Sequence, residues 1–227
     1  MKGAIAATLL LCLPGSIAMA QQSADTASVS FSFSNPALQP PQYSFVVHTD
    51  GTGRYHEGPP GNIDAAAAVP GNSDTTDQDV VIDAKLTALL FMLAHKHHLF
   101  AEHCELNQKN VAFTGTKVLG FAGPEGSGSC SFNYAKDAQL QAVATSLIAV
   151  AYTVAQGRVL QSLLLHDKLG LEAATAVLAQ QQANGQALDI ENIAPVLRAI
   201  AADPNVLNRT RTRAAAMLTM TTTLRER

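Results

Sequence analysis

Apolar and polar side chains alternate along the first part of the chain and predict antiparallel strands. Residues 29–34 alternate apolar side chains with serines, and residues 43–47 repeat the same period of two with aromatic residues. Asp50-Gly51 is a hairpin signal because both residue types tolerate the positive φ of a tight turn. We therefore expect residues 52–57 to return as a third strand.

A second region of pattern begins after a stretch rich in proline, glycine and alanine at 58–76, which we interpret as a surface loop. A short strand is expected at 80–82. Asp83 then has the position of a helix N-cap. Apolar residues spaced by three and four predict a long helix that ends near Cys104; its stripe consists of Leu86, Leu89, Leu90, Leu93, His97, Phe100 and Ala101.

Three more strands are expected after this helix, at 111–114, 117–122 and 130–134, with a glycine-rich turn at 123–128 between the last two. From Asp137 the pattern is helical. Helices are expected from Asp137 through Val154, from there to His166 with Gly157 as a break or weak point, over 171–182, over 190–202, and from Asp203-Pro204 onward.

The order of these elements predicts the fold class. Strands precede helices in blocks and do not alternate with them, which argues against a parallel sheet. We expect an α+β protein with an N-terminal antiparallel β-sheet and one long helix in residues 21–135, followed by an all-helical bundle segment in residues 136–227.

The first twenty residues have the pattern of an export signal. Lys2 precedes an apolar run centred on Leu9–Leu11, Pro14-Gly15 breaks the run, and Ala18-Met19-Ala20 supplies the small residues that a signal peptidase needs. Cleavage before Gln21 would leave 207 of the 227 residues. We expect a soluble protein, secreted or periplasmic, with no transmembrane segment after cleavage.

The cysteines fit this compartment. Cys12 would leave with the signal, and the leucines before it do not suit lipidation. Cys104 and Cys130 remain, and in an oxidising compartment they are expected to form a disulfide. The alternative is two buried free thiols.

Composition and charge narrow the classes of partner. A hydrophobic content of 47% with 15% charged residues is typical of a globular chain. Residues 198–227 carry six arginines against two acidic residues, whereas residues 21–82 are acidic. Two solvated faces are the simple interpretation; contact between the ends or an anionic partner is the alternative. Arg209, Arg211 and Arg213 have no aromatic neighbours and the chain has no tryptophan, so no nucleic-acid partner is expected.

A histidine cluster is the strongest candidate site. On the predicted helix, His95 and His98 share one face, with Glu102 one turn further on, and these ligand types suit zinc or another divalent metal. The alternative is that the histidines form a polar, solvent-exposed face near the end of the helix. His97 lies on the apolar stripe instead, and is expected to pack there with one nitrogen hydrogen-bonded. The chain has no HExxH motif and no second cluster with ligand spacing.

Signals for catalysis are otherwise weak. The chain has no GxSxG elbow, and the loop at 123–129 lacks the lysine of a phosphate-binding loop. Two hypotheses follow. The first is a non-enzymatic exported binding or envelope-assembly module without a cofactor, whose partner is an unknown protein or envelope component. The second is a metal-binding protein or metal-dependent hydrolase built on His95, His98 and Glu102.

Overall fold

The computed structural model describes residues 26–58 and 77–225, with side chains as far as residue 219. The expected signal segment 1–20 and nearly all of the loop at 58–76 lie outside the described residues.

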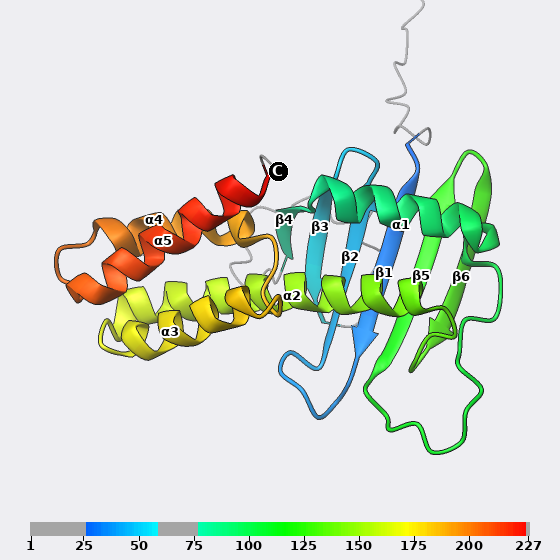
Figure 1. Cartoon of the computed structure of the whole chain (residues 1–227), viewed down its shortest axis with the longest axis horizontal. Coiled ribbons are helices and arrows are strands. Elements are labelled where there is room, and N and C mark those ends of the chain that lie inside the picture. The colour runs from blue at the N-terminus through cyan, green and yellow to red at the C-terminus, as the bar shows by residue number, and fades with distance from the viewer. Residues whose placement is uncertain (1–25, 59–76, 226–227) are drawn as a thin grey trace, which may run out of the picture.

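The N-terminal part is a six-stranded sheet in which every neighbouring pair is antiparallel (Figure 1). The strand order is β4-β3-β2-β1-β5-β6. The strands are β1 (Ser28–Ser34), β2 (Gln42–His48), β3 (Thr52–Glu57), β4 (Asp77–Val81), β5 (Thr116–Gly123) and β6 (Gly126–Phe132). The two-residue period predicted β1 and β2 correctly, and the hairpin signal at Asp50-Gly51 predicted β3.

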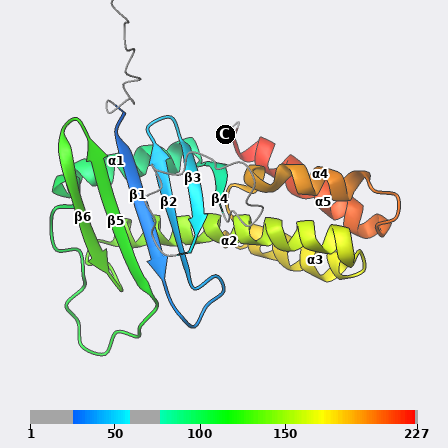
Figure 2. The same ribbon diagram turned by 180° about the vertical axis from the view of Figure 1, so that it is seen from behind.

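Two helices, α1 (Ala84–Lys96) and α2 (Ala138–His166), cover one face of this sheet (Figure 1). The apolar side chains of the alternating strands point to that face and pack in one core. Its largest members are Phe31, Phe45, Tyr55, Leu90, Phe100, Leu119, Phe132 and Leu147. In the described part of the chain no helix lies over the opposite face, which carries the serines of β1 and β6 (Figure 2).

The C-terminal part is a helical bundle with its own core. It contains the second half of α2 together with α3 (Gly170–Ala183), the 3₁₀ turn η3 (Ile190–Ile193), α4 (Ala194–Ala202) and α5 (Asn208–Arg225). The chain is thus α+β, as predicted, and the long helix α2 runs from the sheet into the bundle (Figures 1 and 2).

Segments from elsewhere in the sequence are bonded to both outer strands of the sheet. At the β4 edge, the Val81 amide donates to Oδ1 of Asn192 (2.8 Å), and Nδ2 of Asn192 donates to the Val81 carbonyl (3.0 Å). At the β6 edge, Cys104 and Cys130 form the expected disulfide, with their Cα atoms 5.8 Å apart.

Helix α1 is shorter than predicted. It ends at Lys96, not near Cys104, because His98, Leu99 and Phe100 all adopt positive φ angles, from 52° to 62°. A helix cannot continue through such residues. The turn directs Phe100 into the core, where it is fully buried.

Two strand predictions need correction. Residues 111–114 are not a strand; they form a loop held by Asn133, whose Nδ2 donates to the Ala112 carbonyl (2.9 Å) and whose Oδ1 accepts from the Thr114 amide (2.7 Å). Strand β6 begins at Gly126 and ends at Phe132, and β5 extends to Gly123, so four of the six residues of the expected glycine-rich turn are strand.

Two helix boundaries in the bundle also differ. Gly157 neither breaks nor ends α2, because it is the point at which η3 approaches the helix: a Cβ atom there would overlap the side chain of Ile193. The last helix begins at Asn208, not at Pro204. The carboxylate of Asp203 instead accepts from the Asn205 amide (2.8 Å) in a turn that precedes the helix.

Helix α2 is, by length and apolar composition, the one helix in the described residues that could cross a membrane. Half of its most apolar stretch is buried inside the protein, which is also usual for the core helix of a soluble fold. The length and apolar composition of α2 therefore do not distinguish a membrane-spanning helix from a buried core helix.

Candidate functional site

A pocket of about 390 Å³ lies where the sheet meets the bundle. Segments from four separate parts of the chain line it: the end of β4 and start of α1 at 81–86, Ser146 of α2, Gln182 of α3, and the loop at 187–191. A junction between two structural units, with a volume in this range, is a common setting for a small-molecule site.

Hydrogen bonds across the junction hold the pocket walls in place. Besides its two bonds to Val81, Asn192 accepts from Nε2 of Gln78 through its backbone carbonyl (3.0 Å). Asn192 lies in η3 and directly follows residues 187–191, which we call the pocket loop and which include the first two residues of η3. These bonds therefore fix the pocket loop against β4.

The start of α1 also lines the pocket. The Asp83 carboxylate caps this helix by accepting from the amides of Lys85 (2.8 Å) and Leu86 (3.3 Å), as the sequence predicted. The Asp83 amide donates to Oδ2 of Asp189 (3.2 Å). Asp189 has a φ of 52°, so the pocket loop turns in the left-handed region, which aspartate tolerates better than most residues.

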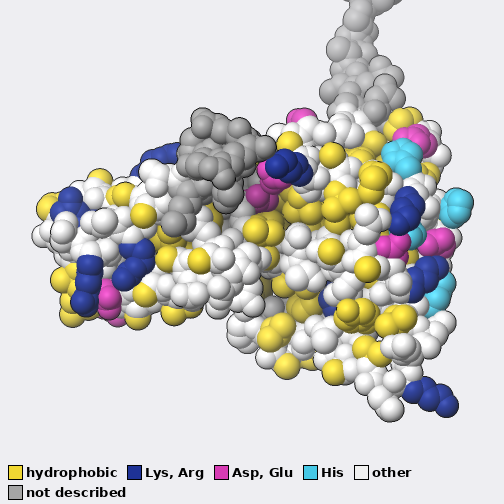
Figure 3. Space-filling view, viewed as in Figure 1, with side chains coloured by type: hydrophobic (Ala, Val, Ile, Leu, Met, Phe, Trp, Pro, Cys, Tyr) yellow, Lys and Arg dark blue, Asp and Glu magenta, His cyan; other side chains and the backbone are white. Residues whose placement is uncertain are grey.

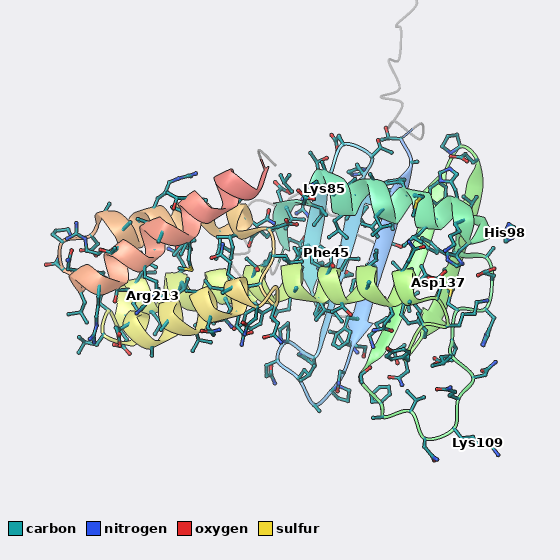
Figure 4. All side chains as sticks on the ribbon, viewed as in Figure 1. Phe45, Lys85, His98, Lys109, Asp137 and Arg213 are labelled. Carbon is teal, nitrogen blue, oxygen red and sulfur yellow. A yellow bond between two sulfur atoms is a disulfide. The ribbon has the colours of Figure 1, made fainter. Side chains whose placement is uncertain are left out.

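The lining combines an apolar base with charged residues. Ile82 and Ile190 are buried, and Leu86 and Leu188 are half-buried. Four charged residues, Asp83, Lys85, Asp189 and Glu191, also line the pocket. Acidic and basic side chains gather beside apolar ones at this junction (Figure 3), and Lys85 lies near the start of α1 (Figure 4). The arrangement suits a ligand with an apolar body.

A second pocket, of about 310 Å³, lies over α1 between Ala27, Thr87, Phe91 and His95. It is smaller, and it is lined by three alanines and Phe91 together with two threonines, His95 and two acidic residues. His95 and Glu125 lie at one end and Asp50 at the other.

The structure places the predicted metal ligands in different environments. His95 donates from Nδ1 to the Phe91 carbonyl (2.7 Å), and its Nε2 lies 3.0 Å from both carboxylate oxygens of Glu125 in the β5–β6 turn. The hydrogen bond to the Phe91 carbonyl is the main cause that raises the pKa of His95, and the interaction with Glu125 raises it further. His98 is exposed beyond the end of α1, where the chain no longer has helical spacing (Figure 4).

Glu102 belongs to a third environment, a polar network around His97. Nδ1 of His97 lies 2.7 Å from Oε1 of Glu102, while Nε2 lies 3.2 Å from Oδ2 of Asp137 without hydrogen-bond alignment. His97 is buried with one nitrogen bonded, which is the packing role that we predicted. In residues 26–58 and 77–225, no group of three or more His, Cys, Asp or Glu residues has a geometry that could hold a metal ion.

The open sheet face contains a row of residue types associated with hydrolases. Ser44, His56 and Asp77 are register partners on β2, β3 and β4. Nδ1 of His56 contacts Oδ1 of Asp77, and Arg54 donates to Oδ2 from Nη2 (3.2 Å). Although burial would raise it, the pKa of Asp77 is lowered by the hydrogen bonds from His56 and Arg54. The buried Ser44 hydroxyl has no hydrogen-bond partner among the described residues, so His56 is not placed as its base.

Comparisons of the chain with protein-family models, with curated proteins and with solved structures found no match. Sequence reasoning missed the junction pocket because its lining consists of ordinary apolar and charged residues from distant segments, with no local motif.

Proposed function

We propose that this chain is an exported, non-enzymatic binding module that holds a small ligand with an apolar body in the junction pocket. The observation that carries the proposal is the pocket itself. It has the volume of a ligand site, a buried apolar base, and walls fixed by hydrogen bonds between the sheet and the bundle.

Export is the second part of the proposal. Its support is the signal-like pattern of residues 1–20 together with the Cys104–Cys130 disulfide, since disulfides persist mainly in oxidising compartments. In such a compartment the protein would meet envelope components or extracellular compounds, which is the source of ligand that we expect.

The test uses a neutral apolar fluorescent probe, N-phenyl-1-naphthylamine, titrated into the purified mature chain. We expect a saturable rise in fluorescence from a single site. Ser146→Trp should fill the pocket from the side of α2 and abolish that rise, because Ser146 lines it. Ser162→Trp is the matched control: the same substitution in the same helix, at an exposed residue outside the lining.

Ser146→Leu is a milder companion variant if the tryptophan is not tolerated. The proposal predicts unchanged probe binding for Ser162→Trp and reduced binding for both Ser146 variants. Equal binding by all four proteins, or no saturable binding by any of them, would contradict it.

A further inference from the structure

Two polar side chains on the helices that line the junction pocket have unused hydrogen-bond acceptors. Ser146 of α2 donates its hydroxyl hydrogen to the Ala142 carbonyl (3.1 Å), so its oxygen meets a ligand as an acceptor. Nε2 of Gln182 donates to the Met217 carbonyl (3.4 Å). Oε1 of Gln182 is buried and has no hydrogen-bond partner among the described residues. A buried acceptor without a partner is destabilising, and a donor on a ligand would remove that cost.

The charged side chains of the pocket give it a net negative charge. Asp83, Asp189 and Glu191 carry one negative charge each, and Lys85 is the one basic residue of the lining, so the net charge is −2. Asp83 and Asp189 already accept backbone amides at the junction. Neither Lys85 nor Glu191 forms an ion pair with another residue in 26–58 or 77–225. The pocket therefore favours a positively charged ligand.

Burial separates the charged part of the lining from the apolar part. Lys85 and Glu191 are exposed to solvent, whereas Ile82 and Ile190 are buried. The exposed residues mark the opening of the pocket and the buried ones mark its base. A ligand that fits this order has an apolar body against the isoleucines and a polar head group at the opening.

We propose that the ligand of the junction pocket is a primary amine with an apolar chain, bound as its ammonium ion, a proposal that rests on the proposed function. An ammonium group has three N–H donors and one positive charge, so it matches both the unused acceptors and the net charge of the lining. A carboxylate with the same chain would meet three acidic side chains and one lysine. An alcohol would bring a donor without the charge, and a quaternary ammonium would bring the charge without a donor.

Competition with the neutral probe N-phenyl-1-naphthylamine tests this choice. Four compounds with the same octyl chain differ in their head group: octylammonium, octyltrimethylammonium, octanol and octanoate. Octylammonium should displace the probe at a concentration about tenfold or more below that of octanoate, with the other two compounds between them. This advantage should shrink as the salt concentration rises, because salt screens the exposed charges at the opening.

Variants of the two exposed charged residues test the source of the preference. Glu191→Gln should reduce the advantage of octylammonium over octanoate several-fold and leave binding of the neutral probe unchanged. Lys85→Gln should increase the advantage, because the lining then loses its basic residue. Asp79→Asn is the matched control: it removes an equal charge from β4, at a side chain that is 93% exposed and outside the lining. Its preference should equal that of the unmodified chain.

Two results would overturn this proposal and leave the proposed function in place, since the probe binds in both. One is a preference for octanoate that Lys85→Gln abolishes, which would define an anion site. The other is equal displacement by all four compounds, because the pocket would then select the apolar chain alone. Absence of saturable probe binding would instead contradict the proposed function, and with it this proposal.

Discussion

Reduction of the Cys104–Cys130 disulfide should cost the protein much of its stability. The two cysteines are 26 residues apart. In the chain-entropy model a loop of this length stabilises the folded state by about 3.5 kcal/mol at room temperature, because the cross-link restricts the unfolded chain. Cys104 is fully buried and Cys130 nearly so, and both thiols would remain as small apolar groups in the reduced protein. The loss should therefore come mainly from the cross-link.

Urea unfolding of the oxidised protein and of the protein reduced with a phosphine measures this difference. A loss of about 3.5 kcal/mol should lower the midpoint by roughly 1–3 M urea for a domain of this size. Cys104→Ala combined with Cys130→Ala is the control, whose midpoint should not respond to the reductant. Equal midpoints for the oxidised and reduced protein, or two titratable thiols in the exported protein, would refute the reasoning.

Three further predictions concern the junction, acid stability and export. Asn192→Ala should lower the free energy of unfolding by about 1–2 kcal/mol and weaken probe binding, because both bonds to Val81 are lost; Asn205→Ala, at an exposed turn, should do neither. The Lys96 hydrogen bond lowers the pKa of Asp137 from 3.8 to about 2. The stability from this group should therefore be present above pH 4 and be lost as the pH falls towards 2, a loss that urea midpoints should show and that Asp137→Asn should reduce. N-terminal sequencing of the exported protein should begin at Gln21, and an intact Met1 on most of the protein would contradict export.

Local sequence signals explain most of the sheet and part of the helices. Strands β1 and β2 follow from alternation, and β3 follows from the hairpin signal at Asp50-Gly51. The start of α1 follows from Asp83, and the disulfide follows from the count of cysteines. The end of α1 was not predictable, since three consecutive non-glycine residues with positive φ are tolerated only because Phe100 is buried by the finished core. The prediction of a break or weak point at Gly157 was wrong for a related reason. This glycine allows close contact with Ile193, a residue far along the chain.

The candidate site was less predictable than the fold. The predicted metal site required His95, His98 and Glu102 to lie on one continuous helix, but α1 ends at Lys96. The pocket depends on four distant segments, and Asn192, which holds two of them together, pairs with backbone atoms of Val81 that any residue would supply. Pairing of that kind leaves no pattern in the sequence.

Native mass spectrometry of the protein isolated from its own export compartment tests the central claim most directly. The account predicts a small-molecule adduct on the unmodified chain and on Ser162→Trp that is missing from Ser146→Trp. Identical, ligand-free masses for all three proteins, or an adduct that persists in Ser146→Trp, would contradict it.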